Sequence, residues 1–332
     1  MIRPKMREAV VIVTPALKEA NNGNWRTAER WAGFLSSRYN VHLASSWPSS
    51  RKAVDNPRLL IALHARRSAE SIEAWSSAFP SRPVVTVLTG TDLYPDIRQD
   101  SVSLGSLRLS TALLVLQNKG IEALPAQFQS KAAVIYQSCS AWKPRAVKPA
   151  PFTLRMVGHL RAEKSPETFM QLAQRFDEAQ GIRLELLGGV IDPELGERAG
   201  RLAAQSKVFF WKGALSYRAT RSRIRDAHLL VHPSRLEGGA HAILEAAMSG
   251  TPVLASKVPG NVGMLGEDYL GYFEHGNVQQ LEDLVYECQE SHATGKGLYG
   301  LLLKQLHARR ALFKPSYERK ILLQFVKHLL PS

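Results

Sequence analysis

Short apolar runs alternate with segments of helical periodicity along nearly the whole chain. In the first half, the runs predict strands over residues 9–14, 41–44, 59–63, 84–88, 113–116 and 133–136. In the second half, they predict strands over 153–157, 184–187, 208–211, 229–232 and 253–255. Strands that alternate with helices are typical of a parallel sheet covered on both faces. The pattern therefore predicts an α/β protein.

The alternation is interrupted over residues 140–151, which read Ser-Ala-Trp-Lys-Pro-Arg-Ala-Val-Lys-Pro-Ala-Pro. Three prolines without periodicity are typical of a linker. The alternation then restarts, which indicates a second domain. We expect an N-terminal domain over 1–150 and a C-terminal domain over 151–332, ending in a helical tail broken at Pro315.

Residues near the expected helix ends have the chemistry of caps. Asn24 is expected to N-cap a helix over 25–37, and Ser165 a helix that opens with Pro166. A helix over 240–248 is expected to end at Gly250. Further helices are predicted over 71–79, 194–205, 218–226 and 278–291.

Composition excludes several classes of protein. No apolar run approaches the roughly 20 residues of a membrane span, so stable membrane insertion is not expected. The basic start before the run 9–13 superficially resembles a signal peptide, but no small-residue cleavage site follows it. Cys139 and Cys288 are the two cysteines, which argues against a disulfide framework. We expect a cytoplasmic protein.

The formal net charge of +14 is unevenly distributed. Residues 1–150 hold 20 Lys and Arg against 10 Asp and Glu, whereas residues 151–332 hold 23 against 19. The first half is therefore expected to meet an anionic partner, although a basic surface that promotes solubility explains the charge equally well. Because aromatic and basic residues do not interleave in a stripe, nucleic acid is not an expected partner.

The predicted strand over 229–232 leads into the segment Glu237-Gly238-Gly239-Ala240-His241 and then a helix that contains Glu245. The first amides of a helix lack partners, and the helix dipole is positive there. The two glycines leave room for an anion to approach those amides. This geometry suits a phosphorylated sugar ligand, and it equally describes an ordinary strand–helix unit with two solvated glutamates.

Other loops at expected strand ends also suit an anionic ligand. The loop after residue 157 contains Arg161 and Lys164, and two cations stabilise a leaving diphosphate, although loop cations are commonly just solvated. Three loops of the N-terminal half are expected to form a polar, cationic pocket. Their residues are Gly23, Asn24, Trp25, Arg26, Thr27, His64, Arg66, Thr91 and Asp92.

Glu237 and Glu245, separated by seven residues with the first followed by Gly238, resemble the signature of the retaining GT-B glycosyltransferases related to glycogen synthase, the glycosyltransferase group 1 family. The resemblance implies two Rossmann-like domains whose parallel sheets face a central cleft. It assigns Glu245 to the nucleotide ribose, and Glu237 with the turn amides to the transferred sugar and the diphosphate. The usual family turn is Glu-Gly-Phe-Gly, so here the aromatic is missing and the last glycine is Ala240.

The resemblance also implies the remaining donor contacts. At the position where the family usually has an arginine that binds the diphosphate, this sequence has His159. Arg161 is therefore expected to act with Lys164. The implied catalytic residues are Glu237, Lys164 and Arg161, and the implied nucleotide-sugar ligands are Gly188, Gly213, Leu215, Gly238, Gly239, Ala240, His241 and Glu245.

No metal and no cofactor beyond the UDP-sugar donor are expected. The chain lacks the Asp-x-Asp triplet that holds a divalent metal in the other major glycosyltransferase fold. His241 and Glu245 are four residues apart and could both face a metal, but no third ligand is evident.

Four phrases resemble one subgroup, the selenosugar synthases of selenoneine biosynthesis, and the similarity extends over nearly the whole chain. They are Thr-Pro-Ala-Leu (14–17), Asn-Asn-Gly-Asn-Trp-Arg-Thr-Ala (21–28), Leu-Thr-Gly-Thr-Asp-Leu-Tyr (88–94) and Val-Gly-His-Leu-Arg-Ala-Glu-Lys (157–164). The resemblance implies transfer of a sugar from UDP-N-acetylglucosamine or UDP-glucose to the selenium of selenophosphate. The wider family commonly has a histidine at the position of Thr89. An acceptor that is already an anion needs no base, which fits this departure.

Two other functions remain open on the sequence alone. One is transfer to a hydroxyl of a lipid or polysaccharide at a membrane surface, with the basic N-terminal half docked on anionic lipid. The other is a non-catalytic GT-B module that binds a nucleotide, although Glu237, Glu245 and Lys164 argue against it.

Overall fold

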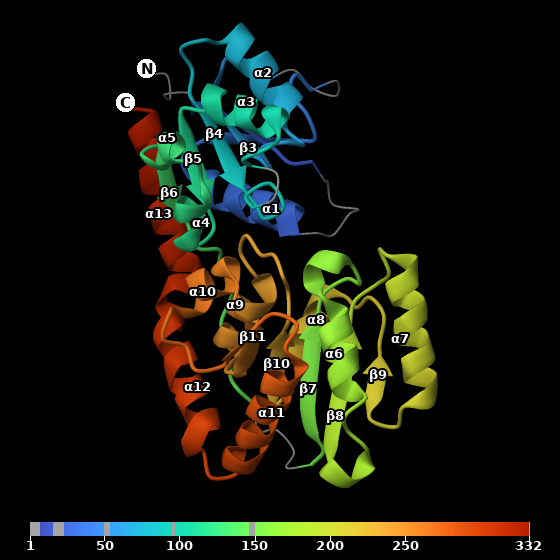
Figure 1. Cartoon of the computed structure of the whole chain (residues 1–332). Coiled ribbons are helices and arrows are strands. Elements are labelled where there is room, and N and C mark those ends of the chain that lie inside the picture. Colours follow the sequence, from blue (N-terminus) through green and yellow to red (C-terminus); the bar gives the residue numbers. More distant parts are fainter. Residues whose placement is uncertain (1–6, 16–22, 50–53, 95–96, 146–149, 332) are drawn as a thin grey trace. The chain divides into compact units, whose positions relative to one another are not determined.

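The computed structural model describes residues 7–15, 23–49, 54–94, 97–145 and 150–331. The chain divides into two compact units (Figure 1). Unit 1 comprises residues 1–137 and 315–332, and unit 2 comprises residues 138–314. Each unit contains a six-stranded parallel sheet and helices, so the predicted α/β class is confirmed.

The sheet of unit 1 has the strand order β2-β1-β3-β4-β5-β6. Strands β1, β3 and β4 are almost wholly buried because their apolar runs are covered on both faces. One face packs against α1 and α13, and the other against α2 and α3. The bounds are β1 Ala9–Val13, α1 Gly23–Leu35, β2 Asn40–Ala44, β3 Pro57–Leu63, α2 Ala69–Ala78, β4 Val84–Leu88, α3 Ser101–Leu109, β5 Ala112–Val115, α4 Lys119–Ala123, α5 Ala126–Gln129, β6 Ala132–Val134 and α13 Pro315–Leu329.

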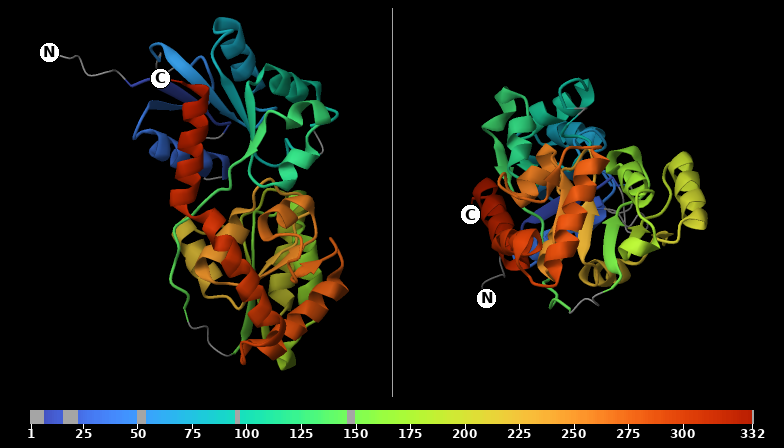
Figure 2. Two further views of the ribbon diagram at one scale, coloured as in Figure 1. Left: turned by 90° about the vertical axis from the view of Figure 1, so that its left-hand side faces the viewer. Right: turned by 60° about the horizontal axis from the view of Figure 1, so that its bottom comes forward.

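The C-terminal helix α13 packs into unit 1, which differs from the division expected at residue 150. Its Leu322 and Val326 lie in the core of that unit. Its Glu318 is fully buried and accepts hydrogen bonds from Arg30 Nε at 2.7 Å and Trp31 Nε1 at 2.6 Å. Figure 2 shows α13 running along unit 1. The apolar stripe of this helix and its buried carboxylate both find their partners about 290 positions earlier in the chain, a pairing that local pattern does not reveal.

We predict that Glu318→Ala destabilises unit 1 by about 3–5 kcal/mol, because it leaves the Arg30 guanidinium without its buried counter-ion. Urea unfolding followed by tryptophan fluorescence measures the loss. Glu29→Ala removes an exposed carboxylate from the same helix as Arg30 and is expected to change the free energy of unfolding by less than about 0.5 kcal/mol. Equal unfolding midpoints for the two variants would contradict the assignment.

The sheet of unit 2 has the order β12-β11-β10-β7-β8-β9. Helices α6 and α11 pack together, as do α8 and α9. The bounds are β7 Phe152–Val157, α6 Pro166–Ala173, β8 Ile182–Leu187, α7 Pro193–Gln205, β9 Phe209–Trp211, α8 Tyr217–Arg225, β10 Leu229–His232, α9 His241–Ser249, β11 Val253–Ser256, α10 Pro259–Leu265, β12 Tyr272–Phe273, α11 Val278–His292 and α12 Gly297–Arg309, with 3-10 turns η2 Ala162–Lys164, η3 Glu178–Gln180 and η4 Arg310–Phe313.

Of the three expected caps, Asn24 is wrong, whereas Ser165 occupies the N-cap position directly before Pro166 but forms no side-chain capping bond. Asn24 lies inside α1, which already begins at Gly23. Ser165 has φ 46° and makes no side-chain bond to the helix backbone; its hydroxyl instead lies 2.8 Å from His275 Nε2. Gly250 ends α9 with φ 76°, as predicted. Among the described residues, none of the helices is long and apolar enough to cross a membrane.

Candidate active site

Three loops at the carboxyl ends of β7, β8 and β9 are joined through glycine backbones. Gly158 N donates to Leu187 O at 2.9 Å, and Gly188 N donates to Gly213 O at 2.9 Å. A Cβ on Gly188 would lie 1.9 Å from Gly158 O, so this position admits only glycine. Gly213 has φ 64°, which also favours glycine. The structure therefore brings the predicted donor residues Gly188 and Gly213 together, with Leu215 two positions further along the chain.

We predict that Gly188→Ala destabilises unit 2 by about 1–3 kcal/mol, because the β7 and β8 loops must separate to admit the methyl group. Thermal unfolding measures the effect. Gly200→Ala in α7 is the matched control, since its nearest side-chain atom would be 4.0 Å away and alanine favours a helix. If Gly188→Ala melts at the wild-type temperature, the tight approach of the two loops is wrong.

The segment after β10 places Glu237 in a buried ion cluster. Lys164 Nζ donates to Glu237 Oε1 at 2.6 Å, and His232 Nε2 lies 2.8 Å from the same oxygen. Because a carboxylate only accepts, His232 Nε2 carries a proton in this arrangement. Ser234 Oγ lies 3.3 Å from that nitrogen. Sequence reasoning predicted Lys164 and Glu237 but missed His232, although it stands at the end of the strand before the turn.

The surroundings of Glu237 control its ionisation. Burial by itself would raise the pKa of this carboxyl, but the charge of Lys164 and the charge and hydrogen bond of His232 outweigh burial. The pKa of Glu237 is therefore held far below its ordinary range, and the group is an anion at neutral pH.

We predict that this cluster makes unit 2 less stable as the pH falls into the acidic range. The pKa of Glu237 is lower in the folded than in the unfolded chain, where it is about 4.3. Its stabilising contribution is therefore complete above that value and decreases as the pH falls below it. Thermal unfolding of the wild type and Glu237→Gln should show a difference in melting temperature that is constant from pH 6 to pH 8 and shrinks toward pH 3. A difference that grows on acidification would contradict the shift.

Residues of β11 and α10 hold the main chain of the Glu237 loop in place. A Cβ on Gly260 would lie 2.0 Å from Glu237 O, so α10 approaches this loop as closely as glycine permits. Ser256 Oγ donates to Ser234 O at 2.5 Å, and Asn261 Nδ2 donates to Ser256 O at 2.9 Å. None of these supports was predicted, because each joins residues that are distant from the glutamate in sequence.

Besides Lys164, the loop after β7 contains two residues that could contact a diphosphate, His159 and Arg161, and their surroundings differ. His159 Nδ1 accepts from Gly189 N at 3.0 Å, so the exposed ring carries its proton on Nε2. Arg161 is 41% exposed, and its Nε lies 3.9 Å from Glu163 Oε2. The structure thus pairs Lys164, and not Arg161, with Glu237.

The turn before α9 begins the helix without a side-chain cap. Gly238 is buried, and Ala240 occupies the N-cap position of α9 without a side-chain capping bond. His241 is the first helical residue and Glu245 lies one turn further, 6% exposed. Glu245 contributes, after burial, to raising the pKa of Tyr217, which places its charge close to that phenol.

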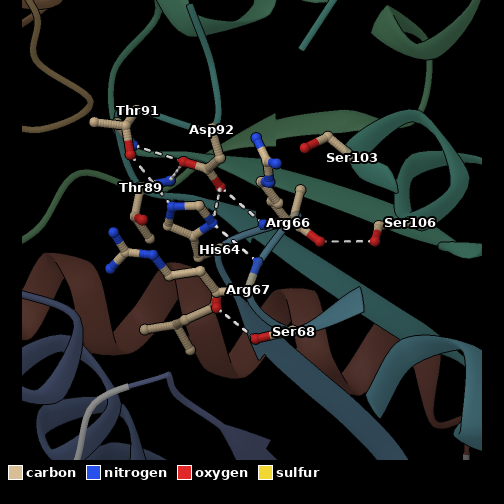
Figure 3. Close-up of polar contacts among 12 residues, drawn as sticks. His64, Arg66, Arg67, Ser68, Thr89, Thr91, Asp92, Ser103 and Ser106 are labelled. Carbon is tan, nitrogen blue, oxygen red and sulfur yellow. Dashed lines mark hydrogen bonds and ion pairs between the residues drawn. The ribbon is translucent and has the colours of Figure 1, made fainter. Parts of the chain in front are cut away.

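The candidate acceptor residues of unit 1 gather at the ends of β3 and β4 (Figure 3). Asp92 is fully buried and accepts from the backbone N–H groups of Ala65, Thr89 and Gly90, each at 2.9 Å. Its carboxylate therefore fixes the β3 and β4 loops against each other. This geometry gives Asp92 the role of positioning the two loops.

His64 lies between these loops in a left-handed conformation, with φ 75°. Its Nδ1 accepts from Arg67 N at 3.3 Å, and its Nε2 lies 3.2 Å from Thr91 Oγ1. The ring is 4% exposed, and Figure 3 shows it beside Asp92. A non-glycine residue in this conformation is strained and persists only where its surroundings hold it, as is frequent at functional sites.

The remaining acceptor candidates differ in accessibility. Arg66 is 56% exposed and its Nε lies 3.7 Å from Asp100 Oδ2. Gly23, Asn24, Trp25 and Arg26 form the partly exposed first turn of α1, which follows β1, the neighbour of β3. Thr27 is buried, and its hydroxyl donates to Gly23 O at 2.8 Å, so it supports the turn from inside. Asn21 and Asn22, which precede Gly23 in the phrase 21–28, lie outside the described part of the chain.

No group of three or more His, Cys, Asp or Glu side chains within the described residues is arranged to hold a metal ion. The pair of His241 and Glu245 therefore gains no third ligand from that part of the chain.

Part of the C-terminal unit matches a known protein family. Residues 142–292 match the family described as glycosyl transferases group 1. Protein CapJ of Staphylococcus aureus is 30% identical over 128 residues, which are 39% of this chain and 31% of CapJ. The chain thus matches less than a third of the length of that relative.

Solved structures resemble the whole chain. Sucrose-phosphate synthase of Thermosynechococcus elongatus is similar with a TM-score of 0.78 and 14% identity, covering 98% of this chain and 99% of that one. HepE of Anabaena, solved in complex with UDP and glucose, is similar with a TM-score of 0.74 and 13% identity, covering 97% of this chain and 100% of that one. The chain has the GT-B fold, and together with the match of residues 142–292 this supports a GT-B glycosyltransferase.

Proposed function

We propose that this chain is a retaining glycosyltransferase that moves a sugar from a UDP-sugar, UDP-N-acetylglucosamine or UDP-glucose, to the selenium of selenophosphate. The observation that carries the transferase proposal is the buried cluster of Lys164, Glu237 and His232 beside a glycine turn at the start of a helix. It combines a cation for a diphosphate with a carboxylate for a sugar that is ionised at neutral pH. A UDP-sugar donor is further supported by HepE, which was solved with UDP and glucose.

In the proposed donor complex, the diphosphate lies on the amides of Gly238–Ala240 and on Lys164, with Arg161 at the loop's outer side. Glu245 and His241 meet the nucleotide ribose and the nearby phosphate, while Gly188, Gly213 and Leu215 line the nucleotide. Lys164 is paired with Glu237, so the donor phosphate has to compete for that ammonium. As the lysine turns to the phosphate, Glu237 is freed to accept hydrogen bonds from sugar hydroxyls.

The proposed reaction breaks the bond between the anomeric carbon and the UDP oxygen and forms a bond between that carbon and selenium. The electron pair of the broken bond leaves with UDP, whose growing charge is stabilised by Lys164 and the helix amides. Selenophosphate supplies the new electron pair as an anion, so no proton has to be removed from it. The product carries selenium on the sugar, with the phosphate still attached until hydrolysis.

Unit 1 supplies the proposed acceptor site. Arg66 and Arg26 provide positive charge, and Thr91 is fixed by His64 at the end of the loops that Asp92 holds. The position where the wider family commonly has histidine is Thr89, whose N–H is bonded to Asp92. A hydroxyl there cannot act as a general base near neutral pH, which favours an acceptor that is already ionised. We propose that the enzyme acts in the cytoplasm.

The test is to incubate the purified protein with UDP-N-acetylglucosamine or UDP-glucose, with and without selenophosphate, and to measure UDP release and product mass. The proposal is supported if UDP release depends on selenophosphate and the product has the mass of the sugar plus selenium, with or without phosphate. Thiophosphate and inorganic phosphate are the matched acceptor controls. UDP release only with an alcohol acceptor would overturn the selenium assignment and keep the glycosyltransferase.

The uneven basic charge favours one second candidate, transfer to a hydroxyl of a lipid or polysaccharide at an anionic membrane. That function requires sedimentation with vesicles that contain phosphatidylglycerol and release at high salt, because surface charge attraction is screened. Absence of sedimentation at low salt would exclude it.

A further inference from the structure

A cavity of about 580 Å³ lies in unit 2 at the amino ends of its strands, the opposite end from Glu237. Ala227 and His228, which immediately precede β10, form part of its wall. Ser249 and Gly250 at the end of α9 form another part, and the α11–α12 pair forms a third. Figure 1 shows this end of unit 2 at the bottom, where α11 and α12 lie side by side. The predicted donor turn begins α9, so the cavity and that turn are separated by the helix length of about 14 Å.

The wall of this cavity is cationic. Arg145, Arg225, Lys304 and Arg310 line it, and none of the described residues in its wall is Asp or Glu. Asp226 pairs with two of them, at 3.3 Å from Arg145 Nη1 and 3.4 Å from Arg225 Nε. In the described part of the chain, the side chains of Lys304 and Arg310 have no ion pair and no hydrogen bond. One acid against four cations leaves an excess of positive charge that an anion would neutralise.

The same cavity has an aromatic wall. His228, His292 and Tyr299 line it. The ring centroids of His228 and His292 are 5.3 Å apart, and those of His292 and Tyr299 are 6.0 Å apart. Burial raises the pKa of Tyr299 to about 12, so its hydroxyl remains a hydrogen-bond donor. The rings meet edge to face, with interplanar angles of 85° and 68°. Aromatic side chains with polar edges suit a heteroaromatic base as a ligand.

We propose that this cavity is a second ligand site, which binds a small soluble phosphate ester that carries a flat ring, such as a nucleoside monophosphate. The phosphate pairs with Lys304 and Arg310, and the ring packs against His292 and Tyr299. The volume lies within the range of small-molecule sites, about 300–1,000 Å³. This site is independent of the proposed reaction, because its residues are distinct from those of the donor turn.

The experiment is calorimetric titration of the full-length protein with AMP, with ribose 5-phosphate and with inorganic phosphate, repeated with Lys164→Met to separate binding at the donor turn from binding in the cavity. We expect AMP to bind tightest, and the double variant Lys304→Ser/Arg310→Ser to bind it at least about 10-fold more weakly. Arg201→Ser, which removes an exposed cation on α7 outside the cavity, is the matched control and should leave the affinity unchanged. Thermal unfolding checks that each variant is folded. If the double variant does not fold, the single variant Lys304→Ser, which changes an exposed position, still tests the proposal.

No binding of AMP, or equal affinity of the wild type and Lys304→Ser, would overturn the proposal. Co-sedimentation with phosphatidic acid vesicles without binding of AMP would also overturn it, since the occupant would then be a lipid surface. AMP binding that is lost in Lys164→Met and retained in the cavity variants would assign the nucleotide to the donor turn and refute a second site. Failure of sugar transfer does not affect these outcomes, because none of them requires turnover.

Discussion

Replacing Glu237 by glutamine is expected to lower the rate of sugar transfer by at least about 100-fold. The amide keeps the size of the side chain but removes the negative charge that Lys164 and His232 hold in place. Positive charge develops on the sugar ring as the bond to the diphosphate breaks, so a fixed anion beside the ring stabilises that state. The measurement is the initial rate of UDP release with saturating donor and acceptor.

Measuring the affinity for UDP distinguishes a loss of the catalytic carboxylate from general damage to the donor site. Glu237→Gln frees Lys164 from its carboxylate, so the affinity for UDP should stay the same or increase while the rate falls. Glu163→Gln, on the same β7 loop at a position 29% exposed, is the matched control and should keep the wild-type rate. A wild-type rate for Glu237→Gln would remove this carboxylate from the reaction.

The central strands were predictable because they are buried on both faces of two parallel sheets. A parallel strand covered on both faces reads as a continuous apolar run, and the runs at β1, β4 and β10 were found within one residue of their bounds. The two-residue β12 was missed, since Tyr272 and Phe273 are too few to form a pattern. Helix α13 was predicted as a helix but not as part of unit 1, because its partners Arg30 and Trp31 lie far away in sequence.

The residues of the donor turn could be selected from the sequence. The contacts that hold them in place could not. A glutamate, two glycines and a helix start form a local pattern, so Glu237 could be selected from sequence. The bond from His232, the close approach of Gly260 and the strained backbone of His64 depend on how strands and loops are brought together. The internal partners of Asp92 and Thr27 could not be predicted for the same reason, because their hydrogen bonds to Ala65 N and Gly23 O form only in the folded chain.

Lys164→Met is expected to lower the rate of transfer by about 100- to 1,000-fold and to weaken UDP binding as well. Methionine fills much of the space that the lysine stem occupies, and the stem packs near Gly158, whose Cβ would lie 3.3 Å from Lys164 Cγ. The variant therefore removes the ammonium rather than the packing. Without it, the leaving diphosphate keeps only the helix amides and loop cations such as Arg161. The measurement pairs UDP titration with the rate at saturating donor.

The comparison of the two variants distinguishes their proposed roles. Glu237→Gln should lose rate and keep UDP affinity, whereas Lys164→Met should lose both, because in the proposed donor complex the lysine, unlike Glu237, contacts the part of the donor that UDP retains. Lys207→Met, at a position 77% exposed on the surface of unit 2, controls for loss of a positive charge and should change neither quantity. If Lys164→Met kept its affinity for UDP, the lysine would serve only as the counter-ion of Glu237, and the diphosphate would have to be held by the helix amides and Arg161 alone.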